Sequence, residues 1–155
     1  EAGHEGKIAV TNAKSYPSVA SFARLTPLGI AFTDPQVGFF GQSYAELDLE
    51  QTVVVDFHLE RNNGRAIVMG EDKGVISLFA DKQSKQLIGG ELVMPHAEHF
   101  THLLSWAVAQ KQSVLSLLKM PYYHPVLEEA IESAVADLAK ELYTPEDIQA
   151  LTPAS

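Results

Sequence analysis

A histidine that precedes a proline, followed closely by two glutamates, is the combination in this 155-residue sequence best suited to chemistry. His124 is joined to Pro125, and the pair Glu128–Glu129 follows within about one helical turn. A carboxylate that accepts a hydrogen bond from an imidazole fixes the tautomer of the ring and stabilises its protonated form. The motif therefore predicts a general acid–base. Either glutamate could reach the ring, because helical side chains lean toward the helix N-terminus.

The same motif also fits a purely structural role. Acidic side chains are favoured in the first turn of any helix by its dipole, and a histidine before a proline can be an ordinary turn residue. The sequence contains no cysteine, no Gly-x-Gly-x-x-Gly and no phosphate-binding loop. A catalytic His124 would therefore need partners from another domain or another chain.

Three further histidines, His96, His99 and His102, first suggest a metal site, since histidine is a common ligand of transition metals. A spacing of three on a helix, however, spreads these side chains over about 120° of its surface. Only neighbouring pairs could share an ion, and no close cysteine or aspartate completes a ligand set. We interpret them as surface histidines and expect no metal; a metal-binding protein is the weaker hypothesis.

The elements that must position these residues follow from hydrophobic periodicity and turn signals. We expect strands at 29–33, 52–59, 66–69, 75–80 and 86–94, with a tight turn at 62–64. We expect helices at 1–13, 43–47, 97–110, 113–118, 125–143 and 144–151, with Ser113 as an N-cap and Pro125 as a first helical residue. This order predicts an α+β fold, an antiparallel β-sheet with helices packed on one side.

Composition narrows the function classes. The length suits one domain, and 46% hydrophobic and 20% charged residues are ordinary for a globular protein. A net charge of −9 argues against nucleic acid and anionic membrane surfaces as partners, and no apolar run reaches the roughly 20 residues that span a bilayer. The lack of cysteine is compatible with a reducing, cytoplasmic location. We expect Trp106 to pack in the core, and Tyr122 and Tyr123 to lie in either the core or an interface.

Several motifs, in order along the chain, resemble the dimerisation domain of the pyridine nucleotide-disulfide oxidoreductases. They are Phe32-Thr33-Asp34-Pro35-Gln36-Val37 with Gly41, the hairpin Val75 to Met94 with Ala80-Asp81-Lys82 and Leu87-Ile88-Gly89-Gly90, and His124-Pro125 with a glutamate five positions after the histidine. Glu129, and not Glu128, stands five positions after His124, so the family motif selects Glu129. The start of the chain, with Glu5-Gly6 and Asn12-Ala13, is similar to the last helix of the preceding FAD-binding domain.

Within the family, the resemblance favours the dihydrolipoamide dehydrogenase branch. Mercuric reductase and the larger thioredoxin reductases carry redox groups near their C-termini, and the mercuric reductase group is a cysteine pair; this chain has no cysteine. The soluble transhydrogenases generally lack the histidine that is present here. A glutathione reductase-like enzyme stays an alternative, because the family motif usually has threonine where Val126 stands. The second alternative is a dimerisation module without a catalytic role.

The resemblance implies a division of labour between two subunits. His124 and Glu129 would form the acid–base pair that serves the active site of the partner subunit of a homodimer. His124 and Pro125 would lie against the partner's flavin. FAD and NAD would bind to other domains of the full-length enzyme, so the present chain would bind neither and would be inactive alone. A 2-oxoacid dehydrogenase complex is a further possible partner.

The resemblance also divides the chain. Residues 1–13 would be the remnant of the FAD-binding domain helix, 14–28 a linker and 29–155 the dimerisation domain. The chain begins at Glu1 rather than methionine. We therefore expect it to be part of a longer protein whose FAD- and NAD-binding domains and redox disulfide precede residue 1.

Overall fold

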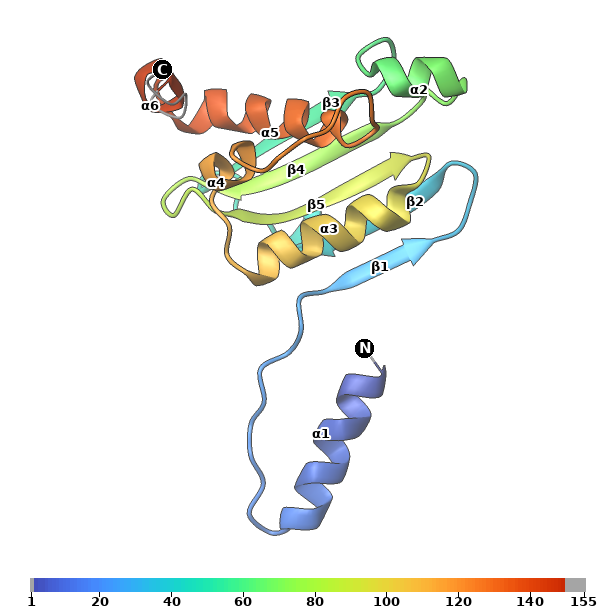
Figure 1. The fold of residues 1–155 in the computed structure, drawn as a ribbon. Coiled ribbons are helices and arrows are strands. Elements are labelled where there is room, and N and C mark those ends of the chain that lie inside the picture. Colours follow the sequence, from blue (N-terminus) through green and yellow to red (C-terminus); the bar gives the residue numbers. More distant parts are fainter. Residues whose placement is uncertain (1, 150–155) are drawn as a thin grey trace.

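The structure, a computed structural model, describes residues 2–149. It opens with helix α1 (Ala2–Ser15), none of whose residues is buried. A segment without helix or strand, 16–27, begins with a turn at 16–18 and leads from this helix to the first strand, and Figure 1 shows α1 standing apart from the rest of the molecule. The expected helix at 1–13 is confirmed where the structure describes it; its role as a domain remnant, and the division at residue 28, stay predictions.

Five strands form one antiparallel sheet in the order β1-β2-β5-β4-β3. Their bounds are β1 (Leu28–Ala31), β2 (Gln36–Gly41), β3 (Thr52–His58), β4 (Val75–Asp81) and β5 (Leu87–Met94). The β4–β5 hairpin lies at the centre of the sheet and agrees with the strands expected at 75–80 and 86–94. Its turn is closed by Asp81, whose side chain accepts hydrogen bonds from the backbone N–H and the hydroxyl of Ser84, each at 2.6 Å.

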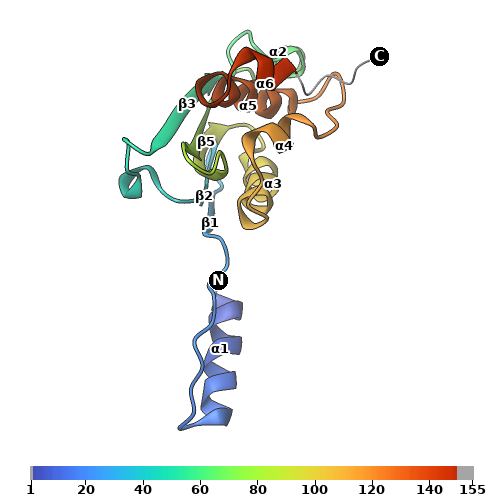
Figure 2. The same ribbon diagram turned by 90° about the vertical axis from the view of Figure 1, so that its left-hand side faces the viewer.

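The main helices cover one face of this sheet, as the sequence predicted (Figure 2). They are α3 (Ala97–Ala109), α4 (Val114–Leu118) and α5 (Glu129–Leu142), followed by the short α6 (Pro145–Gln149). The core lies between the two layers and is built from the inward residues of both, among them Phe40, Leu78, Leu92, Leu104 and Leu138. Ser113 caps α4 as expected, since its hydroxyl accepts the N–H of Ser116 at 3.1 Å.

Close approach between the layers depends on small residues at the contact. In β2, Gly38 faces α3, and a Cβ built on it would lie 2.0 Å from the hydroxyl oxygen of Thr101. Thr101 is fully buried and donates its hydroxyl hydrogen to the carbonyl of Ala97 at 2.6 Å. The sheet can therefore seat α3 at this distance only where the strand has no side chain.

Two expectations about the strands are wrong. The segment expected as a strand at 66–69 belongs to helix α2 (Gly64–Met69), because Asn63 caps its start and Gly70, in the left-handed conformation, ends it. Strand β2 was not predicted, because Asp34-Pro35 signals the end of a strand and the glycine-containing stretch that follows carries weak strand propensity. The short helix expected at 43–47 is a single 3₁₀ turn, Tyr44–Glu46.

Two further corrections concern helices α5 and α3. Helix α5 begins at Glu129, not at Pro125, and residues 124–128 form turns instead. The indole of Trp106, expected in the core, is 65% exposed. The apolar stripe predicted for α5 is confirmed, with Ile131, Ala134 and Leu138 buried. The predicted end of the last helix at Leu151 lies outside the described residues.

No helix within residues 2–149 is both long and apolar enough to cross a lipid bilayer.

Candidate active site

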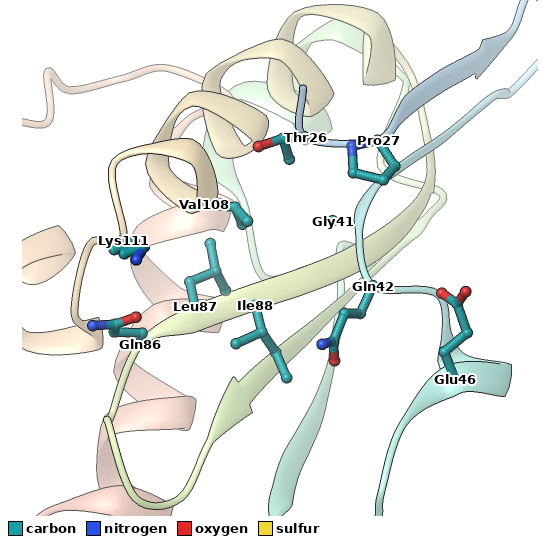
Figure 3. A pocket seen from close by; sticks show the side chains of 10 residues that line it. All are labelled: Thr26, Pro27, Gly41, Gln42, Glu46, Gln86, Leu87, Ile88, Val108 and Lys111. Atoms are coloured by element: carbon teal, nitrogen blue, oxygen red, sulfur yellow. The ribbon is translucent and has the colours of Figure 1, made fainter. Parts of the chain in front are cut away.

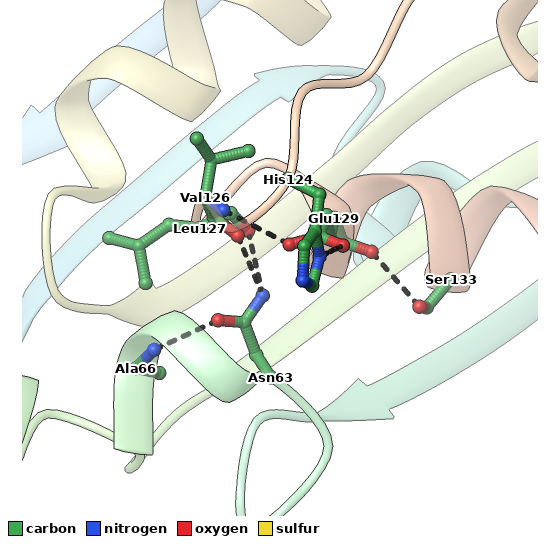
Figure 4. Close-up of polar contacts among 7 residues, drawn as sticks. All are labelled: Asn63, Ala66, His124, Val126, Leu127, Glu129 and Ser133. Carbon is green, nitrogen blue, oxygen red and sulfur yellow. Dashed lines mark hydrogen bonds and ion pairs between the residues drawn. The ribbon is translucent and has the colours of Figure 1, made fainter. Parts of the chain in front are cut away.

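The histidine and one of the two glutamates singled out in the sequence are in direct contact (Figure 4). His124 Nδ1 lies 2.8 Å from Glu129 Oε1. The second oxygen of the same carboxylate, Oε2, accepts the backbone N–H of Val126 at 3.0 Å. The neighbouring Glu128 makes no side-chain hydrogen bond within the described part of the chain, so the structure pairs His124 with Glu129 alone.

The contacts of Glu129 keep it ionised. Hydrogen bonds from the His124 side chain and from the Val126 N–H, together with the nearby imidazole charge, outweigh its partial burial and hold the pKa of the Glu129 carboxyl below the usual 4.5. An ionised carboxylate has no hydrogen to donate, so Nδ1 must carry the proton of this hydrogen bond. In the neutral imidazole, Nε2 is then the unprotonated, basic nitrogen.

The side chain of His124 is open to solvent. The His124 side chain is 81% exposed, whereas that of Glu129 is 29% exposed, and Nε2 has no hydrogen-bond partner among residues 2–149. The peptide bond between His124 and Pro125 is cis. A partly buried orienting carboxylate with an exposed base is what an acid–base group needs if its substrate comes from outside the domain.

The loop that carries His124 is held by buried contacts at both of its sides. Leu127 is only 9% exposed and packs in the hydrophobic core. Tyr122 is half-buried and donates its hydroxyl hydrogen to the carbonyl of Leu117 at 3.3 Å. Burial and the charge of Glu132 raise the pKa of Tyr122 to about 12, so this phenol stays protonated. Tyr123, in contrast, is 78% exposed beside His124.

One residue of this site was missed by the sequence reasoning. Asn63 was placed in a turn, but its side chain reaches the loop and donates hydrogen bonds to the carbonyls of Val126 and Leu127. An asparagine before a short apolar run is also an N-cap signal, and that signal could have identified α2. The contact with the loop joins residues more than 60 positions apart and has no signature in the local sequence.

The three other histidines do not form a common site. His96 and His99 line a hollow of about 310 Å³ beside Arg65 and Glu128, while the Nδ1 of His102 lies 2.8 Å from the carbonyl of Glu98 on its own helix. His96 precedes α3 and is not part of it. Within residues 2–149, no group of three or more histidine, aspartate or glutamate side chains is arranged to hold a metal ion.

A larger hollow, of about 570 Å³, is shown in Figure 3; neither His124 nor Glu129 lines it. It is bordered by the end of the segment 16–27, by β2 and β5, and by the C-terminal end of α3. Its two charged residues, Glu46 and Lys111, lie at opposite ends of it, as Figure 3 shows. Polar groups do not converge in this hollow, so it lacks the arrangement that His124 and Glu129 provide.

The fold and the position of this pair define a class of protein. Residues 28–135 match the dimerisation domain of the pyridine nucleotide-disulphide oxidoreductases. The chain belongs to this family, and the resemblance seen in the sequence is confirmed.

Curated relatives of the chain include dihydrolipoyl dehydrogenases. That of Haloferax volcanii is 29% identical over 147 residues, which cover 92% of this chain and 30% of the relative. That of Rhizobium etli is 26% identical over 138 residues, which cover 88% of this chain and 29% of the relative. The chain thus spans about three-tenths of the length of these relatives.

Solved structures share the fold. LpdA from Mycobacterium tuberculosis superposes with a TM-score of 0.73 at 24% identity, over 87% of this chain and 29% of that protein. The HOCl-induced flavoprotein disulfide reductase RclA from Escherichia coli superposes with a TM-score of 0.68 at 18% identity, over 84% of this chain and 30% of that protein. The predicted antiparallel sheet with helices on one side is therefore the family fold.

Proposed function

We propose that this chain is the dimerisation domain of a flavin-dependent dihydrolipoyl dehydrogenase and supplies the acid–base pair His124–Glu129 to the active site of a partner subunit. The observation that carries the proposal is the geometry of the pair: Glu129 holds Nδ1, while the side chain of His124 is largely exposed and its Nε2 has no hydrogen-bond partner within residues 2–149. The choice of dihydrolipoamide as the substrate is supported by the named relatives, because they are dihydrolipoyl dehydrogenases.

The overall reaction would convert dihydrolipoamide and NAD⁺ to lipoamide, NADH and a proton. Nε2 of His124 accepts the proton of one substrate thiol, which leaves a thiolate, the form of sulfur that attacks a disulfide. Glu129 stabilises the imidazolium that results and keeps the ring in the tautomer that presents Nε2. Attack of this thiolate on the redox disulfide of the full-length enzyme would form a mixed disulfide and break the original S–S bond, and His124 could return its proton to the thiolate that leaves.

FAD and NAD are the cofactors that this function requires. The chain has no glycine-rich dinucleotide motif, so it fits a cofactor only as a neighbour. The exposed edge formed by Tyr123, His124 and Pro125 fits that role, because nothing in the domain covers the ring of His124. His124 and Pro125 would lie against a flavin held by the partner subunit. FAD, when bound, supplies the passage of electrons from the dithiol to NAD.

A second copy of the chain is the partner that we propose for the domain. Beside the loop, the large apolar residues Leu103, Trp106 and Met120 are 47%, 65% and 45% exposed. They border a mostly apolar hollow of about 420 Å³ between α3, α4 and the loop. Solvent-exposed apolar surface of this kind marks an interface, and the family match identifies a dimerisation domain. This face is continuous with the loop of His124, so the same contact would bring the histidine to the partner.

The test is His124→Gln in the full-length enzyme, with His102→Gln as the matched control. His102 is also an exposed histidine, and its ring nitrogen Nδ1 lies 2.8 Å from the carbonyl of Glu98 on its own helix. We expect the substitution of His124 to lower kcat for dihydrolipoamide oxidation by about 10² to 10⁴, a general acid–base contribution. Unchanged turnover in the His124→Gln enzyme would mean that the pair is structural.

The choice of substrate can be tested with the same enzyme. We expect turnover with dihydrolipoamide and NAD⁺, while turnover with glutathione disulfide and a reduced nicotinamide cofactor would establish the glutathione reductase-like alternative.

A place in a 2-oxoacid dehydrogenase complex and a cytoplasmic location accord with this function, and the absence of cysteine in the chain accords with a reducing compartment.

A further inference from the structure

The side chain of Asn63 joins the start of α2 to the loop that carries His124 (Figure 4). Its Oδ1 accepts the N–H of Ala66 at 2.9 Å, which caps the helix. Its Nδ2 donates to the carbonyls of Val126 at 3.1 Å and Leu127 at 3.3 Å. The residue is 2% exposed, so no water competes for these bonds.

The orientation of the Asn63 amide follows from its neighbours. The N–H of Ala66 can only donate, so the amide oxygen must face it. The two N–H donors of Nδ2 then face two carbonyl oxygens, which can only accept. Every hydrogen-bonding group of this amide except one acceptor lone pair is therefore used, and rotation of the amide would set like groups against each other at both ends.

These bonds reach the reactive pair through a single residue. Val126 is held from both sides, since its carbonyl accepts from Asn63 and its N–H donates to Glu129 Oε2. The other oxygen of Glu129 holds the Nδ1 of His124. The path from α2 to the imidazole is thus an unbroken series of hydrogen bonds, across a loop with no helix or strand of its own.

We propose that Asn63 is the positioning residue of the acid–base pair: it fixes the backbone of Val126 and Leu127 so that the Glu129 carboxylate can hold the Val126 N–H and the His124 ring at once. Its effect on turnover rests on the function proposed above, whereas its effect on the geometry of His124 does not.

Two variants separate this role from the capping of α2. Asn63→Ser and Asn63→Asp both keep an oxygen that can accept the N–H of Ala66, and both lack the amide donors. Asn62→Ser is the matched control, because Asn62 is the adjacent asparagine and donates to the carbonyl of His58 at 2.8 Å instead. All three variants can be made in the 155-residue chain.

The measurement is nitrogen-15 NMR of the His124 ring, together with hydrogen exchange of the Val126 amide. In the unsubstituted chain and in Asn62→Ser, we expect neutral His124 to hold its proton on Nδ1 and the Val126 amide to be protected. In both Asn63 variants, we expect a mixture of the two imidazole tautomers and at least about 10-fold faster exchange at Val126. A ring and an amide that behave as in the unsubstituted chain would overturn the proposal.

A measurement on the unsubstituted chain covers the case in which both Asn63 variants fail to fold. The side-chain amide hydrogens of Asn63 should exchange slowly and show nuclear Overhauser contacts to the loop. An Asn63 side-chain amide that exchanges as fast as the exposed amide of Asn62 would exclude the tether.

In the full-length enzyme, we expect Asn63→Ser to lower kcat by about 10-fold to 100-fold, the cost of a small misplacement of a catalytic group, while Asn62→Ser leaves it unchanged. If Asn63→Ser no longer keeps the His124 proton on Nδ1 but turnover is unchanged, the proposed function is contradicted and the positioning role stays in place. An intact tautomer with normal turnover, in a His124-dependent enzyme, would contradict the positioning role alone.

Discussion

Glu129 holds His124 Nδ1 with one carboxylate oxygen and the Val126 N–H with the other, at 2.8 Å and 3.0 Å. The two bonds join the imidazole to the backbone two residues further along the chain. The ring and its loop are therefore oriented by one carboxylate, and removal of that carboxylate should disturb both.

The carboxylate should also make stability depend on acid pH. Because the pKa of Glu129 lies below its usual 4.5 in the folded chain, ionised Glu129 contributes stability above pH 4.5, and that contribution is lost as the pH falls through the folded pKa. We expect Glu129→Gln to lower the free energy of unfolding at pH 7. The difference from the unsubstituted chain should shrink as the pH falls below 4.5.

Urea unfolding at each pH measures this difference. Glu46 and Asp81 also have lowered pKa values, but they are present in both chains and cancel. Glu128→Gln is the control, because its side chain makes no hydrogen bond within residues 2–149. A difference for Glu129→Gln that stays constant from pH 7 to pH 3 would contradict the prediction.

The exposed apolar face beside the loop should control association. We expect the chain to sediment as a dimer of twice 16.9 kDa, and Trp106→Ser to raise its dissociation constant at least about 10-fold, since buried aromatic residues dominate interface energies. Sedimentation equilibrium across a concentration series gives both values. Val68→Ser is the control, because Val68 is 78% exposed on α2 and does not line the apolar hollow beside the loop. Equal dissociation constants for the two variants would place the interface elsewhere.

The contact between β2 and α3 should not tolerate a methyl group. Gly38→Ala would set a Cβ against the buried hydroxyl of Thr101, so we expect it to reduce the free energy of unfolding by about 1–3 kcal/mol. Gly64→Ala is the matched substitution, because Gly64 lies in α2 with no atom within 4 Å of a Cβ, and it should be neutral or stabilise by up to about 1 kcal/mol. Urea unfolding of both variants tests the pair; an equally stable Gly38→Ala chain would show that α3 can move away.

Local sequence signals were sufficient to predict an element where that element is long and its hydrophobic pattern is regular. The β4–β5 hairpin, α3 and the apolar stripe of α5 could all be predicted, because two apolar segments joined by a short polar loop indicate a hairpin and helical periodicity reports one buried face. Short segments were less informative. Four apolar residues at 66–69 fit a strand or a helix equally, and the cap provided by Asn63 decides for the helix.

The sequence by itself determined that a histidine before proline stands one helical turn ahead of two carboxylates, and the family register selected Glu129. It could not determine that the ring of His124 contacts the carboxylate of Glu129. The tertiary structure decided that, because α5 begins at Glu129 and not at Pro125, so that residues 124–128 turn back and bring the ring to the carboxylate. The hydrogen bonds of Asn63 hold that turn from a distant part of the chain. Periodicity reports which face of an element is buried, but contacts between distant segments arise only when the core is packed.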